Sequence, residues 1–99
     1  MPMTVVVTRD VAPRFRGFLA SVMLEIAPGV YTAPTMTQGV RDRVWSVLRE
    51  WHAELQEGSV VMTWRDLRAS GRQAVLTLGI PARELVDYDG MILIRRRTD

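Results

Sequence analysis

The sequence predicts an α+β fold in which two helices pack on one face of a mainly antiparallel sheet. Three observations lead to this prediction. A β-branched run opens the chain, two stretches with helical apolar periodicity follow, and the second half holds strand-length runs separated by turn residues. The length of 99 residues corresponds to one domain, so we expect a single domain over residues 1–99.

The first third of the chain predicts a strand, a helix and a short strand. Residues 3–8 (MTVVVT) are apolar with little interruption, which is typical of a central strand buried on both faces. Pro13 suits a first helical turn. An apolar stripe from Phe15 to Ile26 then predicts a helix that is stopped at positions 28 and 29 by proline and glycine. Residues 30–33 are a short strand candidate.

The second helix is the clearest element of the sequence. Apolar residues recur at positions 40, 44, 47, 48, 51 and 55, charged residues that include Arg41 lie among the remaining positions, and Gly58 ends the helix. Residues 59–64 and 74–80 then predict a β-hairpin around a polar turn. We expect a loop over residues 81–90 and a last strand over residues 91–94.

This order of elements comes closest to the ferredoxin-like arrangement, a split βαβ fold. One strand expected between the first helix and the second helix is short or missing. A small sheet exposes unpaired backbone groups along its edge strands, and a short apolar terminal strand can pair with the edge of a second subunit. We therefore expect this strand at the interface of a symmetric dimer. The alternative is that this strand pairs within its own chain.

The amino-acid composition limits which kinds of site the chain can form. The chain has no cysteine and one histidine, which excludes disulfides, thiolate metal sites and multi-histidine metal sites within one chain. All 13 basic residues are arginine, whose planar fork fits phosphate, although a GC-rich genome would produce the same bias. No apolar run approaches the ~20 residues of a membrane span, and we expect a cytoplasmic protein.

Several short motifs occur in a recognisable order. They are VVVT at 5–8, PRFRG at 13–17, MLE at 23–25, GVY at 29–31, VW at 44–45, GSVVMTW at 58–64 and VDYDG at 86–90. Together they resemble the type I-E form of the second CRISPR-associated protein, written here as Cas two. The resemblance implies a ferredoxin-like homodimer that sits between dimers of the Cas one integrase while double-stranded pre-spacer DNA runs across the assembly.

The resemblance also implies which arginines contact DNA. Arg14 and Arg16 lie in the first turn of the predicted first helix, where exposed N–H groups and the helix dipole favour phosphate. Arg83 matches a third DNA-contacting position, whereas its neighbour Ala82 departs from the arginine of the resembled subtype. We therefore expect sequence-neutral backbone binding with one phosphate-binding arginine fewer in each subunit.

Asp10 is the candidate catalytic and metal-binding residue. Members of the resembled family are described as metal-dependent endonucleases, and Asp10 with its mate in a dimer could share Mg²⁺. The competing interpretation is a loop aspartate that helps to open the first helix. The sequence thus predicts a DNA-bridging subunit with no catalytic role. The alternatives are a Mg²⁺-dependent endonuclease acting on DNA or RNA, and a toxin-like ribonuclease or regulator.

Other conspicuous side chains have structural interpretations. We expect the aspartates of VDYDG to form a turn, the three tryptophans to pack in the core or at a dimer interface, and His52 to face solvent. The arginines at 95–97 flank the integrase interface, touch DNA or form a solvated tail.

Overall fold

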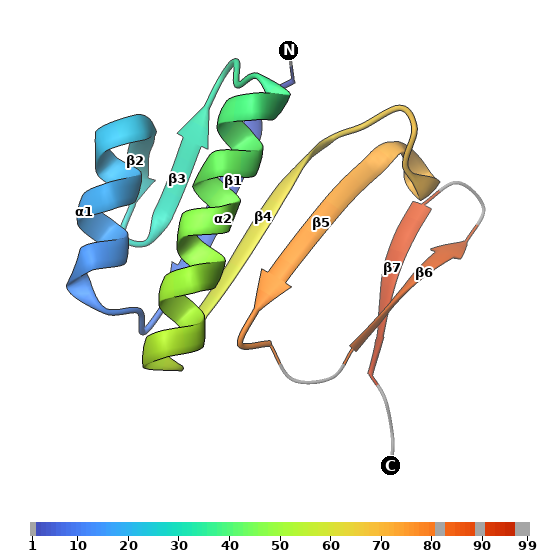
Figure 1. The fold of residues 1–99 in the computed structure, drawn as a ribbon. Coiled ribbons are helices and arrows are strands. Elements are labelled where there is room, and N and C mark those ends of the chain that lie inside the picture. Colours follow the sequence, from blue (N-terminus) through green and yellow to red (C-terminus); the bar gives the residue numbers. More distant parts are fainter. Residues whose placement is uncertain (1, 81–82, 89–90, 97–99) are drawn as a thin grey trace.

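A five-stranded antiparallel sheet carries both helices on one of its faces (Figure 1). The computed structural model describes residues 2–80, 83–88 and 91–96, with side chains over residues 2–80. The strand order is β2-β3-β1-β4-β5, and β6 and β7 form a separate two-stranded sheet. The elements are β1 (Thr4–Arg9), α1 (Pro13–Val22), β2 (Leu24–Ala27), β3 (Val30–Ala33), α2 (Gln38–Leu55), β4 (Ser59–Arg65), the short 3₁₀ turn η1 (Ser70–Arg72), β5 (Gln73–Leu78), β6 (Arg83–Tyr88) and β7 (Met91–Arg96).

The order βαββαβ with neighbouring strands 2-3-1-4 is the ferredoxin-like arrangement, which confirms the predicted fold class. The central strand is β1, which pairs with β3 on one side and β4 on the other. In the described part of the chain, no helix is long and apolar enough to cross a membrane.

The core lies between the sheet and the two helices. Val6 on β1 and Met62 on β4 point to the helices and are fully buried. Phe15 and Leu19 of α1 and Leu48 of α2 close over them and are fully buried as well. Burying a side chain of this size contributes about 1.5–3 kcal/mol, so this layer contributes strongly to the stability of the domain.

The opposite face of the sheet carries several valines among polar side chains. Successive side chains of a strand alternate between faces, so Val5 and Val7 point away from the helices. Val61 is paired with Val7 and shares that face. Val7 is 41% exposed and Leu24 on the edge strand is 66% exposed. This face therefore resembles the inner surface of a two-sheet sandwich rather than a solvent-facing layer.

The first helix is shorter than the sequence predicts. It ends at Val22, and the stretch predicted as its last turns is the strand β2, which supplies the strand that was missing from the pattern. Gly29, with φ +78°, turns the chain between β2 and β3, and its carbonyl accepts the backbone N–H of Thr8 at 2.7 Å. The prediction was wrong because apolar residues at 22, 23 and 26 fit a helix as well as a strand, and pairing with β3 decides between them.

The predicted loop over residues 81–90 is also wrong. The segment Arg83–Tyr88 is the strand β6, which pairs antiparallel with β7. Asp87 therefore lies in a strand rather than in a turn, and Asp89 lies outside the described residues. The terminal strand β7 pairs with β6 of its own chain, which agrees with the alternative that this strand pairs within one chain. A contact of this hairpin with a second subunit remains a prediction.

Two details of the second helix differ from the prediction. Val40, expected on the apolar stripe, is 44% exposed, whereas Arg41 is 5% exposed. The buried stripe runs through Arg41, Val44 and Leu48, one position later than the apolar pattern begins. His52 does not face solvent: it is half-buried, with Nε2 3.2 Å from the carbonyl oxygen of Gly58.

The tryptophans pack as predicted. Trp51 meets the rings of Phe15 and Phe18 edge to face, with ring centroids 5.6 and 5.4 Å apart. Trp45 and Trp64 pack against the same core. Such edge-to-face pairs add to the stabilisation that an aromatic cluster gains from burying apolar surface.

Gly58 provides a test of how closely the strand ends pack. It has φ +73°, and a Cβ there would lie 2.5 Å from the carbonyl oxygens of Arg9 and Asp10. We expect Gly58→Ala to lower the free energy of unfolding by at least about 1–3 kcal/mol, measured by denaturant titration. Gly17→Ala, where nothing lies within 4 Å of the new methyl group, is the control and should be neutral or stabilising. Equal stabilities of the two variants would contradict this packing.

Candidate nucleic-acid interface

The N-terminus of α1 is open to an anion. The helix begins at Pro13, and its N-cap is Ala12, which has no side-chain oxygen to accept a backbone N–H. The first turn of the described helix carries no acidic residue that would neutralise the positive end of the helix dipole. Pro13 has no N–H, and the N–H of Phe15 donates to the Ala12 carbonyl at 3.0 Å, so an anion at this entrance would rely mainly on the arginine side chains and on the helix dipole.

Arg14 turns from this helix entrance toward α2. Its Nη1 lies 3.6 Å from Oε2 of Glu54, and its guanidinium carbon lies 5.4 Å from the centre of the Trp51 ring. The side chain is 48% exposed. An exposed ion pair at this distance contributes about 0–1 kcal/mol, so the guanidinium can exchange Glu54 for another anion at little cost.

Arg16 turns toward β2 instead. Its Nη2 lies 3.8 Å from Oε2 of Glu25, and the side chain is 57% exposed. The Glu25 carboxylate is itself held, because Oε2 accepts the backbone N–H of Gly29 at 3.0 Å. This backbone N–H lowers the pKa of Glu25, and the charge of Arg16 adds to the effect. Glu25 is thus an anchored anion that orients Arg16.

The structure brings Arg14 and Arg16 together at one helix entrance but points them at different neighbours. Both guanidinium groups are accessible, and each forms a loose pair with a carboxylate, to which Arg14 adds its contact with the Trp51 ring. Long side chains on such weak pairs reorient easily. The two arginines can therefore converge on one phosphate run or contact two separate phosphates.

Asp10 lies beside Arg16 rather than beside other acids. It follows β1 in a left-handed conformation with φ +57°, and it is exposed. It does not cap α1, because the N-cap is Ala12. A depression of about 340 Å³ is lined by Thr8, Arg9, Asp10, Val11, Arg16, Pro28 and Gly29. Over the described residues, no group of three or more potential metal-ligating side chains occurs.

The third predicted arginine is described only in its backbone. Arg83 is the first residue of β6, where it is paired with Arg96, and its side chain lies outside the described part of the structure. Its position is therefore at a strand end rather than in a loop. Its role in DNA binding stays a prediction.

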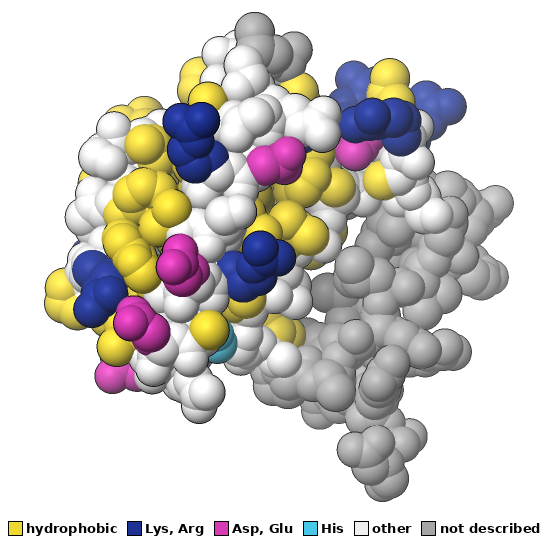
Figure 2. Space-filling model, viewed as in Figure 1, with side chains coloured by type: hydrophobic (Ala, Val, Ile, Leu, Met, Phe, Trp, Pro, Cys, Tyr) yellow, Lys and Arg dark blue, Asp and Glu magenta, His cyan; other side chains and the backbone are white. Residues whose placement is uncertain are grey.

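A second cationic region was missed from the sequence. Figure 2 shows basic side chains gathered over the connection between β4 and β5, which contributes the exposed residues Arg65, Arg68 and Arg72. Arg41 is buried close by, with its guanidinium over the Trp64 ring. The spacing of Arg41 from Val44 and Leu48, three and seven residues, was the available signal that this arginine faces inward.

The fold and this surface define a small ferredoxin-like α+β protein with an arginine-bearing helix entrance. A family model described as CRISPR-associated protein (Cas_Cas2CT1978) matches residues 3–93. The chain belongs to this family, which confirms the resemblance that its motifs indicate. The match runs from β1 into β7, so it includes the positions of all three predicted arginines.

The pH dependence of stability tests the anchored carboxylate. Because folding lowers the pKa of Glu25 from its ordinary value of 4.5, its contribution is present above that value and is lost as the pH falls through the lowered pKa. We expect Glu25→Gln to reduce stability at neutral pH and to match the wild type in strong acid, as measured by denaturant titration. Glu50→Gln, an exposed change on α2, is the control. A deficit that is independent of pH would contradict the assignment.

Proposed function

We propose that this chain is a homodimeric DNA-binding subunit that bridges integrase dimers and positions the pre-spacer duplex during CRISPR spacer acquisition. One observation carries the proposal: in a chain of this CRISPR-associated family, Arg14 and Arg16 stand exposed at a helix entrance that has no acidic first turn. This arrangement suits the sugar-phosphate backbone, which is a regular row of anions. Phosphate contacts position a duplex without reading bases, so the binding is sequence-neutral.

A two-fold axis would make the helix entrance an effective DNA site. One entrance offers two guanidinium groups, and a symmetric dimer offers two entrances. Each phosphate that is neutralised adds about 0.9 to the slope of log affinity against log salt concentration. Four arginines therefore bind a duplex tightly at low salt and release it steeply as salt rises.

The uncovered sheet face supports the dimer. Val5, Val7 and Val61 lie on this face, and Met3 at its margin is 55% exposed. Burying apolar surface contributes about 25 cal/mol for each Å², so packing this face against a second copy is favourable. A two-fold interface uses the same surface of both subunits, so this face would pack against its own copy. The C-terminal strand, expected at the same interface, would extend it.

The endonuclease alternative has less support. It depends on Asp10, which lies in a depression that it shares with Arg9 and Arg16. Sharing Mg²⁺ between two carboxylates would require Asp10 from each subunit of the dimer. The cationic surroundings of this aspartate suit a bound phosphate better than a divalent cation.

The arginine pair is tested by duplex binding. We expect Arg14→Ala with Arg16→Ala to weaken binding at least tenfold and to reduce the salt slope by about 0.9 for each phosphate that the variant no longer neutralises, measured by fluorescence anisotropy over a range of salt concentrations. Arg43→Ala with Arg49→Ala removes the same charge from exposed positions on α2 and should have a much smaller effect. Equally weakened binding in both double variants would show that net charge alone binds DNA.

Asp10→Asn distinguishes the proposed bridging function from the endonuclease alternative. Under the bridging proposal, this variant binds the duplex and supports spacer acquisition as the wild type does. If Asp10→Asn abolishes acquisition, or removes a Mg²⁺-dependent cleavage by the purified protein, the endonuclease alternative is correct.

The sheet face is tested by the oligomeric state. We expect Val7→Arg to convert the dimer to a monomer, because the new charge would be buried without a partner in the interface. Sedimentation velocity measures the change, and Ser46→Arg on the exposed side of α2 is the control. A wild-type protein that is monomeric, or a Val7→Arg variant that stays dimeric, would contradict the assignment of this face.

A further inference from the structure

Arg41 is a buried cation without an ionic partner among the residues that the structure describes. The residue is 5% exposed, and its Nε and Nη1 are buried with no hydrogen-bond acceptor in that part of the chain. Its guanidinium carbon lies 4.1 Å from the centre of the Trp64 ring, so a cation–π contact is its main interaction. A buried charge that lacks an ionic partner is strongly unfavourable. Such an arrangement is explained when a ligand supplies the missing anion.

The surroundings of Arg41 form a recess. A cavity of about 370 Å³ opens beside it and is lined by Pro2, Met36, Gln38, Trp64 and Leu67, together with charged residues of the β4–β5 connection. Arg65 and Arg68 are among these charged residues and add positive charge at the rim. The lining of the recess thus combines apolar side chains, three arginines and one carboxylate.

The carboxylate in the lining of the cavity, Asp66, forms no ion pair with Arg41, although the charge of Arg41 adds to the larger effect of the Arg68 backbone N–H in lowering the pKa of Asp66. Its Oδ1 accepts the backbone N–H of Arg68 at 2.9 Å and lies 3.5 Å from Nε of the same residue. Asp66 is therefore engaged in its own turn. On the other side, α2 begins at Gln38, and its described first turn contains no acidic residue. The helix dipole adds to the positive potential of the recess.

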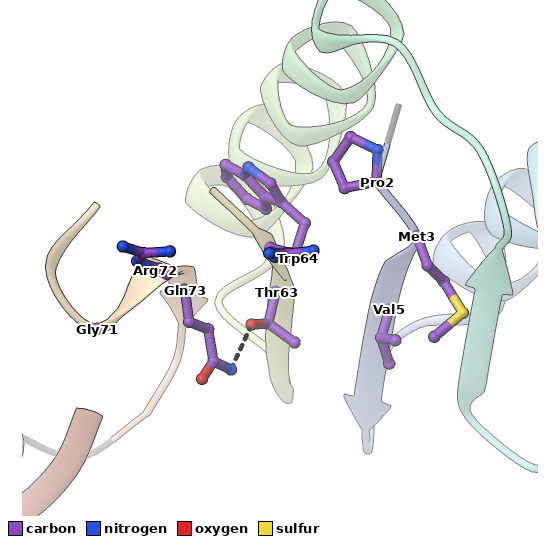
Figure 3. Close-up of a pocket in the computed structure, with 9 residues that line it drawn as sticks. Pro2, Met3, Val5, Thr63, Trp64, Gly71, Arg72 and Gln73 are labelled. Carbon is purple, nitrogen blue, oxygen red and sulfur yellow. Dashed lines mark hydrogen bonds between the residues drawn. The ribbon is translucent and has the colours of Figure 1, made fainter. Parts of the chain in front are cut away.

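Trp64 shapes the recess because it lies against α2. Trp64 also lines a neighbouring hollow of about 650 Å³, together with Pro2, Met3 and Val5. Figure 3 shows these side chains. On that side, the side chain of Gln73 donates a hydrogen bond to Oγ1 of Thr63 at 2.8 Å. These two polar groups of the neighbouring hollow are thus paired with each other, while the indole Nε1 of Trp64 is buried without a partner among the described residues.

We propose that this recess binds the carboxylate of an acidic side chain on a partner protein. The buried Arg41 lines this recess together with apolar side chains, whereas the phosphates of a duplex lie on a stiff, broad surface that does not enter a recess of this size. A glutamate or aspartate carries its charge on an apolar stem, so the stem contacts Met36, Leu67 and the Trp64 ring while the carboxylate meets Arg41.

This site is separate from the proposed DNA surface. Arg41 is thirteen positions from Glu54, the partner of Arg14, and a helix rises 1.5 Å for each residue, so about 20 Å of α2 separates the two sites. The proposal does not depend on DNA binding at the entrance of α1. It adds a docking site for an acidic protein segment at the other end of the helical layer.

Nuclear magnetic resonance on the full chain tests the site. The probe is a blocked tripeptide with a central glutamate between two leucines, and the same peptide with glutamine is its control. We expect the glutamate peptide to shift the Nε–H signal of Arg41 and the indole N–H signal of Trp64, and the glutamine peptide to shift them at least tenfold more weakly. Arg41→Met should abolish the response, and Arg43→Met, an exposed change on the same helix, should keep it.

The fold and the choice of anion are tested in the same samples. Because Arg41→Met removes a buried charge and keeps an apolar stem of similar shape, its midpoint of thermal unfolding should equal or exceed that of the wild type. Inorganic phosphate, and a short duplex added to the Arg14→Ala, Arg16→Ala variant, should leave the two signals in place. Equal responses to both peptides, or stronger responses to phosphate or duplex than to the glutamate peptide, would overturn the proposal.

Discussion

The pairing of β1 on both of its edges is the constraint on which the rest of the structure depends. Because β3 and β4 flank it, β1 has no free edge, and its side chains alternate between the face under the helices and the opposite face. The covered face holds Thr4 and Val6 under the two helices. The end of the same strand delivers the chain to Asp10 and then to the entrance of α1, so the central pairing also places the proposed DNA surface.

The overall fold was predictable because its signals are local. The β-branched run of β1, the long periodic helix α2 and the β4–β5 hairpin each depend on residues close together in sequence, and each is found where the sequence predicts it. The end of α1 and the whole of β2 were not predictable in this way. Ile26 and its neighbours suit either structure, and pairing with β3 decides the outcome.

The candidate site was also predictable only where its features depend on residues close together in sequence. The placement of Arg14 and Arg16 at an open helix entrance follows from Pro13 and from the motif that contains them. The anchoring of Arg16 by Glu25 was not predictable, because it requires the β2–β3 turn to bring the Gly29 amide to the carboxylate. The burial of Arg41 was missed because arginine is normally expected on the exposed side of a helix. Its contact with Trp64 on β4, which is distant in sequence, accompanies its burial here.

The two helix N-termini give the molecule two cationic sites of different character. The entrance of α1 is exposed and holds its arginines by loose pairs, which suits exchange with the phosphates of a mobile duplex. The entrance of α2 lies beside a recess with apolar walls, which suits a single inserted side chain. Under the two proposals, one end of α2 lies near bound nucleic acid and the other end lies near a protein partner.

Site-directed photo-crosslinking tests the central claim most directly, since the chain has no cysteine to compete with a label. Gly17→Cys places a photo-reactive label one residue beyond Arg16 at a position with open space, and Ser46→Cys places it on the exposed side of α2. The account predicts that duplex DNA crosslinks to the label at position 17 and not to the label at position 46. Crosslinking at position 46 alone, or equally at both, would contradict it.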